Sequence, residues 1–221
     1  EGVPVFYARV DHVSVPLAQE GTGQVVVDFT PEPLTQDVSF VFHIEKTADV
    51  VVDSLTAEIS GIPSTMELTT GLILAQKTYK LLFRPTYAAL PSAADSASAE
   101  TLRCEASVNI PGIVRSHTED MVTGPGILQI AIYTHYDYEE EGTQRKAAKV
   151  FHAGINLYHT LKERKSLQWD EEENGYRQAS RSITVEIGSP LNIDKDGILN
   201  GGSTSTGLDQ WIPGETFEIE V

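Results

Sequence analysis

Hydrophobic and polar residues alternate along most of this chain, and a period of two residues is typical of a β-strand with one buried face. The clearest example is DVSFVFHIEK (37–46), where the residues between the hydrophobic positions are mostly polar. This segment is expected to form a strand whose inner face lies in a hydrophobic core. The predicted inner face consists of Val38, Phe40, Phe42 and Ile44.

Other segments with strand character are separated by turn or loop residues. They cover residues 24–30, 51–60, 77–84, 101–110, 126–136, 149–158, 181–188 and 215–221. The segment 3–15 also alternates, but Pro4 and Pro16 interrupt it, which fits a linker or an edge strand. Helical character is weak, and only one short helix is predicted, at residues 157–165.

The phrase VVDSLTAEISGIPSTMELTTG (51–71) predicts a strand, a turn and a second strand. Gly61 and Pro63 are expected to mark the turn between the two strands, and Gly71 to end the second one. The expected core positions of this phrase are Leu55, Ala57, Ile59, Met66 and Leu68. Since none of these residue types supplies acid, base or metal-binding chemistry, we expect no functional site here.

The pattern as a whole predicts an all-β fold. Many short strands at steady spacing, without an internal repeat of 20 to 50 residues, indicate a β-sandwich with long loops and at most one short helix. Three segments are expected to be loops, at residues 91–100, 170–175 and 194–209. Residues 1–22 are expected to be an inter-domain segment or an edge strand, followed by a single sandwich domain at 23–221.

The net charge of the chain limits the classes of partner that it is expected to bind. The formal net charge is −16, from 32 acidic and 16 basic side chains. Nucleic acids and anionic membranes attract positive charge, so neither is an expected partner. No apolar run approaches the roughly 20 residues of a membrane-spanning helix. The first residues also lack the basic and apolar regions of a signal peptide.

Residues that could carry chemistry are few. Cys104, the single cysteine, lies in an alternating segment and is expected to be a buried strand residue with no histidine nearby to activate it. No histidine belongs to an HExxH motif or pairs with the cysteine at zinc-site spacing. The histidines are His12, His43, His117, His135, His152 and His159. We therefore predict no catalytic, cofactor-binding or metal-binding residues and no cofactor.

Two acidic stretches resemble cation sites only weakly. DKDG (194–197) begins like a calcium-binding loop, but its glycine comes at the fourth position and Ser205 stands where the bidentate glutamate belongs. A turn built on aspartate and glycine is the better interpretation. DEEE (170–173) is expected to be a solvated loop.

The two tryptophans lie beside predicted loops. Each is expected to plug one end of the sandwich, and Trp211 to anchor the last strand in the core. An alternative remains open, because aromatic side chains on loops can stack on sugar rings. In that interpretation Trp169, Trp211 and the loop residues Tyr136 and Tyr138 form the platform of a carbohydrate-binding module.

Three parts of the sequence together carry a family resemblance. The run LTAEISGIPSTMELTTG (55–71) follows PEPLTQDVSFVFHIEK (31–46), and the chain closes on QWIPGETFEIEV (210–221). This pattern resembles the fimbrillin-like cell-surface proteins of Bacteroidales, and most closely their anchor or accessory subunits. The resemblance covers most of residues 23–221. It implies a transthyretin-like, Greek-key β-sandwich that corresponds to the C-terminal one of two such domains.

The resemblance also implies a function. It predicts a non-catalytic structural or adhesion protein of the cell surface, a fimbrial (pilus) subunit or its anchor, attached to the outer membrane through a lipid in a region outside this chain. The implied partners are other fimbrial subunits, joined by β-strand exchange, with a host protein or a glycan as further ligands. Segments 3–15 and 215–221 are the candidate exchanged strands, since termini are free to pair with another chain.

A hydrolase with dispersed carboxylates is the remaining alternative. With 32 acidic residues, some pair of carboxylates is inevitable and carries no information. Such an enzyme would need convergent carboxylates in a deep pocket.

Overall fold

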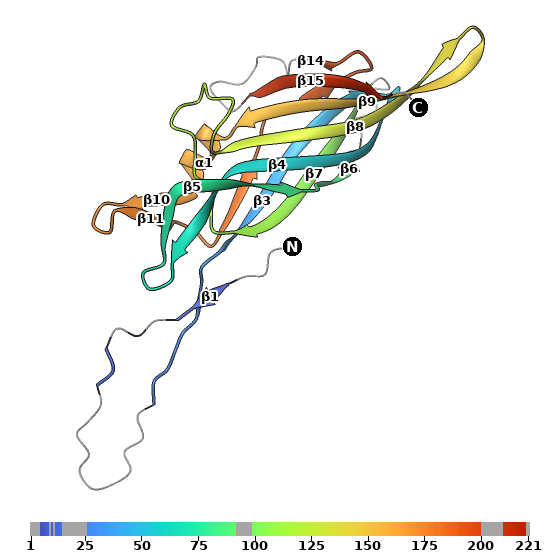
Figure 1. Cartoon of the computed structure of the whole chain (residues 1–221). Coiled ribbons are helices and arrows are strands. Elements are labelled where there is room, and N and C mark those ends of the chain that lie inside the picture. The colour runs from blue at the N-terminus through green and yellow to red at the C-terminus, as the bar shows by residue number, and fades with distance from the viewer. Residues whose placement is uncertain are drawn as a thin grey trace.

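The computed structural model describes residues 5–8, 10, 12–14, 26–91, 99–199 and 210–219. These residues are mostly in β-strands, with one short helix, α1 (Tyr158–Arg164), so the predicted all-β class is confirmed. Two sheets face each other to form a sandwich (Figure 1). In the described part of the chain, no helix is long and apolar enough to cross a membrane.

The large sheet has seven strands. Their order is β10 (Leu167–Asp170), β11 (Gly175–Gln178), β5 (Leu72–Phe83), β4 (Val50–Glu67), β8 (Ile127–Glu140), β9 (Thr143–Asn156) and β15 (Trp211–Ile219). All neighbouring strands in this sheet are antiparallel. The β8–β9 hairpin extends past the other strands at one end of the molecule (Figure 1).

The small sheet has six strands. Their order is β14 (Ile198–Leu199), β13 (Leu191–Ile193), β3 (Gln36–Thr47), β7 (Ala99–Ile110) and β6 (Thr86–Ala89), and β12 (Ser182–Glu186) also pairs with β3. β12 and β13 run parallel to β3, one after the other along the same edge. β3 is therefore a central strand, with the antiparallel β7 on its other side.

The hydrophobic core lies between the two sheets. The predicted inner face of β3 is confirmed, since all four of its hydrophobic side chains are fully buried. Opposite them lie buried residues of the large sheet, including Ile59 on β4, Ile132 on β8 and Phe151 on β9. Cys104 on β7 also belongs to this core, as its alternating neighbourhood predicts.

The predicted turn at Gly61 and Pro63 is wrong. β4 continues through both residues to Glu67, and the chain reverses only at residues 68–71. The register between β4 and β5 shifts between Ile59 and Ile62, so Gly61 lies at a bulge. Its φ is 88°, a value that glycine adopts at little energetic cost. Both turns and bulges use such values, so a glycine in the sequence is compatible with either.

Gly61 is also a point of close packing. The loop at 111–126 lies against it, and the amide N–H of Val114 donates a hydrogen bond of 2.9 Å to the Gly61 carbonyl. The adjacent Ser60 holds the same loop, because its hydroxyl donates to the Gly124 carbonyl and accepts from the Ile127 amide. The phrase at 51–71 thus anchors a long loop on the edge of the core.

Several other predictions need correction. Residues 26–30 of the predicted strand at 24–30 form no strand. Most of their side chains are exposed, and their backbone pairs with no described strand. The sequence analysis missed the hairpin of β10 and β11, and the acidic run at 170–173 belongs to its turn. The helix predicted at 157–165 is confirmed as α1. Residues 92–98 and 200–209 of the predicted loops lie outside the described residues.

The N-terminal segment enters the fold through a small ribbon. β1 (Phe6–Tyr7) pairs with β2 (Glu32–Pro33), and the Leu34 amide donates a hydrogen bond of 2.8 Å to the Val5 carbonyl. This ribbon is separate from both sheets. Residues 5–7 are therefore not an edge strand of the sandwich.

Candidate functional site

Part of each terminal segment is paired within the chain, Phe6–Tyr7 with β2 and residues 211–219 with β9, whereas residues 220–221 lie outside the described residues. β15 forms seven residue pairs with β9, from Trp211 with Ile155 to Ile219 with Ala148. Across this ladder, the Lys149 ammonium lies 3.2 Å from a Glu218 carboxylate oxygen. Since β15 is a fixed part of the large sheet, residues 215–219 are not a free strand.

A long open edge occurs instead on β5. One side of β5 pairs with β4, whereas β11 meets its other side only at the pair Tyr176–Ile73. Beyond that pair, no described strand is bonded to the outer edge of residues 74–83. This segment contains neither proline nor glycine, so all its outward N–H and C=O groups can pair with another strand.

The side chains on this edge are mainly apolar or aromatic, with two lysines, Lys77 and Lys80, among them. Leu81 and Phe83 are half-buried and pack against the core from the inner face. Leu74, Tyr79 and Leu82 are exposed, and Leu82 keeps 71% of its surface accessible. By comparison, the other long edge of this sheet, on β15, carries Pro213, which lacks a backbone N–H.

Three surface cavities are described. The Tyr7 cavity, of about 330 Å³, lies between the N-terminal ribbon and β11. The β9–β15 groove, of about 230 Å³, is a shallow apolar depression on the outer face of the large sheet. The Trp169 cavity, of about 390 Å³, lies between α1, the loop at 113–117 and the β10–β11 hairpin. None of the three holds a pair of carboxylates, which gives no support to the hydrolase hypothesis.

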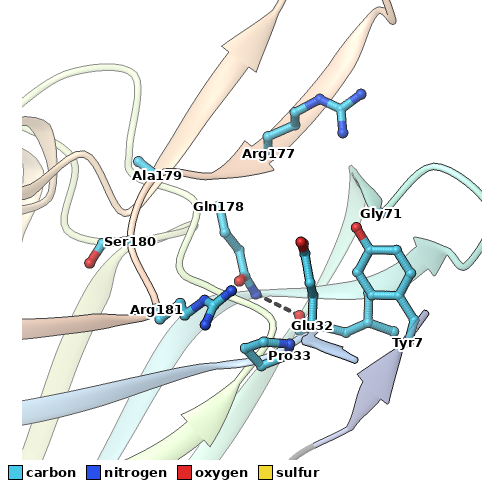
Figure 2. A pocket seen from close by; sticks show the side chains of 10 residues that line it. Tyr7, Glu32, Pro33, Gly71, Arg177, Gln178, Ala179, Ser180 and Arg181 are labelled. Carbon is cyan, nitrogen blue, oxygen red and sulfur yellow. Dashed lines mark hydrogen bonds between the residues drawn. The ribbon is translucent and has the colours of Figure 1, made fainter. Parts of the chain in front are cut away.

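The polar groups of the Tyr7 cavity serve mainly to join parts of this chain. Figure 2 shows Gln178, Arg181 and Glu32 gathered around it, with the Tyr7 ring beside Gly71. Gln178 donates hydrogen bonds to the carbonyls of Leu34 and Pro111, which ties the ribbon to the sandwich. The side chains at this cavity thus connect the N-terminal ribbon to the sandwich.

Arg177, which also lines the Tyr7 cavity, is held in place by hydrogen bonds to other residues of this chain. Its guanidinium donates one hydrogen bond of 2.7 Å to Asp170 and another of 2.9 Å to the Thr70 carbonyl. The hydrogen bond from Arg177 holds the pKa of the Asp170 carboxyl below its ordinary value. Asp170 also accepts hydrogen bonds from the amides of Glu172 and Glu173. The acidic run at 170–173 is therefore a structured hairpin turn.

The Trp169 cavity combines aromatic and basic side chains. Trp169 is 50% exposed, and its ring meets the Tyr176 ring edge to face at 5.1 Å. Arg115, Lys162 and Lys165 line the same cavity. The Trp169 cavity is the largest of the three, and it combines a half-exposed indole with several basic side chains, which makes it the candidate site for a small ligand.

The aromatic residues predicted as a glycan platform do not gather. Trp211 is 8% exposed and lies in the core, as its predicted role as an anchor requires. Tyr136 and Tyr138 belong to β8 and line none of the three cavities, so their placement in a loop is wrong. Only Trp169 is presented at a cavity, with Tyr176 as a neighbour that the sequence analysis missed.

Two of the histidines and the DKDG stretch have structural explanations. Nδ1 of His135 lies 2.8 Å from Asp53, and His159, which is in α1, pairs with Glu119. Asp194 accepts hydrogen bonds from the amides of Asp196 and Gly197, so DKDG is the turn between β13 and β14. Among the described residues, no three histidine, cysteine or acidic side chains cluster as metal ligands.

Cys104 is expected to be unreactive in the folded protein. Burial raises the pKa of its thiol to about 12, and thiolate is the reactive form. At pH 8 we expect Ellman's reagent to label the thiol only in denaturant. Rapid labelling without denaturant would contradict this prediction.

The same pKa shift affects stability at high pH. As pH rises from the ordinary pKa of 9.0 towards 12, the Cys104 thiol stays protonated in the folded state but loses its proton in the unfolded state, so Cys104 lowers the stability of the folded state there.

A signal for the missed residues was present in the sequence. Asn174-Gly175 is a typical turn dipeptide, and Asn174 has a φ of 50°. The dipeptide marks the end of the turn, and the turn at 171–174 pairs Trp169 with Tyr176. The basic residues carry no such signal, because α1, the loop at 113–117 and the hairpin meet only through the tertiary fold.

Comparison of this chain with protein-family models, with curated proteins and with solved structures finds no match. The resemblance to fimbrillin-like proteins and the transthyretin-like subclass therefore stay predictions.

Proposed function

We propose that this chain is a non-catalytic structural or adhesion protein of the cell surface that assembles with other subunits by β-strand addition. The observation that carries the proposal is the open edge of β5 at residues 74–83. A strand that pairs there lies beside β5, on the side away from β4, and satisfies the outward backbone groups of β5. The fimbrillin-like pattern supports the same role, in a pilus subunit or its anchor at the outer membrane.

The side chains explain why an added strand would bind at this edge. Its backbone would gain main-chain hydrogen bonds, and its alternate side chains would cover Leu81 and Phe83, which β5 leaves half-buried. The donor would be a segment of another subunit with alternating hydrophobic residues. Segment 3–15 of a second copy has that pattern and serves as a probe.

Replacing Leu82 with lysine tests the proposal. A charge on an edge strand opposes the addition of a hydrophobic strand. We expect a labelled peptide with the sequence of residues 3–15 to bind the protein in fluorescence polarisation, and Leu82→Lys to weaken binding about tenfold. Leu68→Lys is the matched control, because Leu68 is 65% exposed but lies in the turn after β4.

Equal effects of the two lysine variants would place the binding elsewhere. The absence of any peptide binding, together with a monomer at all concentrations in light scattering, would overturn strand addition by this chain.

Carbohydrate binding is a second candidate function, and the Trp169 cavity favours it. The exposed indole presents an apolar face of the kind on which a sugar ring stacks. A glycan array on the protein and on Trp169→Ala tests this role. Binding that the variant leaves unchanged would exclude the Trp169 cavity as its site.

A further inference from the structure

The Trp169 cavity concentrates positive charge in a strongly acidic chain. Arg115, Lys162 and Lys165 line it together with His117, and none of its lining residues is acidic. Among the described residues, no carboxylate forms an ion pair with any of the three cations. The chain has twice as many acidic as basic side chains, so this local field is opposite to that of the whole molecule. Such a field attracts an anionic ligand.

Two of the cations contact the same aromatic ring. The Arg115 guanidinium and the Lys162 ammonium each lie 5.5 Å from the centre of the Tyr158 ring. The ring attracts both cations, but the cations repel each other. A nearby anion would relieve that repulsion, and contact with the ring restrains both cations before a ligand binds.

Lys165 occupies a backbone position that favours glycine. It follows α1 as the C-cap, with φ of 49° and ψ of 51°, and its N–H donates to the Leu161 carbonyl. Glycine is the usual residue in this left-handed conformation, because a side chain there is strained. The lysine therefore costs stability at this position, while it places a third positive charge at the cavity.

The floor of the cavity is rigid. The buried Ser166 hydroxyl accepts a hydrogen bond of 3.1 Å from the Ile113 backbone N–H, and the Ser166 carbonyl accepts one of 3.1 Å from the side-chain Nε2 of the fully buried Gln36. The loop at 116–121 is held by Asn156, whose side-chain amide donates to the carbonyls of Thr118, Glu119 and Met121. The charged and aromatic groups are thus presented on a preorganised frame.

We propose that the Trp169 cavity binds an acidic saccharide, a sugar that carries a carboxylate. The sugar ring lies against Trp169, and its carboxylate faces Arg115, Lys162 and Lys165. The volume of about 390 Å³ accommodates one or two rings. This inference rests on the carbohydrate-binding candidate above and names the chemical class of its ligand.

The test compares 3′-sialyllactose with lactose by isothermal titration calorimetry, because the two differ in the acidic sugar. We expect 3′-sialyllactose to bind at least about tenfold more tightly, since charged hydrogen bonds are added. Its affinity should fall as salt is raised. Lys165→Gly and Trp169→Ala should each weaken binding about tenfold.

Lys165→Gly is informative because it should also raise the melting temperature by relieving the left-handed backbone, so a loss of binding cannot come from unfolding. Glu141→Gly is the matched control, since Glu141 also has a positive φ, of 52°, at the distant β8–β9 turn. It should leave binding within about twofold.

The outcomes separate this inference from the function on which it rests. If lactose and 3′-sialyllactose bind equally and Trp169→Ala weakens both, carbohydrate binding stands and the acidic class is wrong. If inorganic sulfate binds as tightly as 3′-sialyllactose and Trp169→Ala changes neither, the cavity is a simple anion site and the inference is wrong. If neither sugar binds, both the inference and carbohydrate binding at this cavity are overturned.

Discussion

Gly61→Ala is expected to lower the free energy of unfolding by about 4 kcal/mol, a large part of the stability of a typical domain. A Cβ atom at this position would lie 2.6 Å from the Gly126 amide nitrogen and 2.6 Å from the Val114 carbonyl oxygen. Both are backbone atoms, so no side chain can turn aside to make room. The positive φ of 88° adds conformational strain. Urea unfolding followed by circular dichroism measures the effect.

Gly142→Ala separates the two causes. Gly142 has a φ of 74°, but a Cβ atom there would meet nothing within 4 Å. It should therefore cost only the left-handed conformation, about 1 kcal/mol. If Gly61→Ala costs no more than Gly142→Ala, the loop at 111–126 does not pack against β4 as closely as described.

Trp211→Ala is expected to cost about 4 kcal/mol, within the range for a large buried aromatic side chain. The Trp211 ring packs edge to face against Phe42 at 5.8 Å, and its Nε1–H donates to the Ser189 carbonyl at 2.9 Å. Removing it leaves a cavity between the two sheets and an unpaired carbonyl. Because Trp211 begins β15, hydrogen exchange should increase along β15 and the facing residues of β9.

Trp169→Ala is the control for this prediction. The same side chain is removed, but from a surface position, so the loss should be below about 1 kcal/mol. Chemical unfolding of the two variants, with far-UV circular dichroism as the probe, gives the comparison. Similar losses in both would show that Trp211 is not the anchor of the last strand.

The sequence pattern predicted the strands that have one face in the core and the other face exposed. In β3 the alternation from Val38 to Ile44 corresponds residue by residue to the buried face, because the core determines which residues are hydrophobic. Cys104 was predicted as a core residue for the same reason, whereas Trp211 was predicted from its place just before the last strand. α1 was also predicted, although it is only seven residues long.

Elements that depend on distant contacts were not predictable. Gly61 reads as a turn in the sequence, and only the packing of the loop at 111–126 makes it a bulge within one long strand. The same limit applies to the Trp169 cavity, where Arg115 comes from the loop at 113–117 and the two lysines come from α1 and its C-cap. The open edge of β5 is invisible in the sequence as well, since it depends on which strands fail to pair.

The parallel pairing of β3 with β12 and β13 has a consequence for how this protein folds. Residues 37–41 must find residues 182–186, with most of the chain between them. Contacts so far apart in sequence slow folding, because the chain loses entropy when it closes the long loop and gains the stabilising contacts only afterwards. Until β12 and β13 dock, one edge of the central strand β3 is exposed on the nascent chain and is open to wrong partners. We expect this protein to refold slowly and to need protection from aggregation until its C-terminal third has emerged.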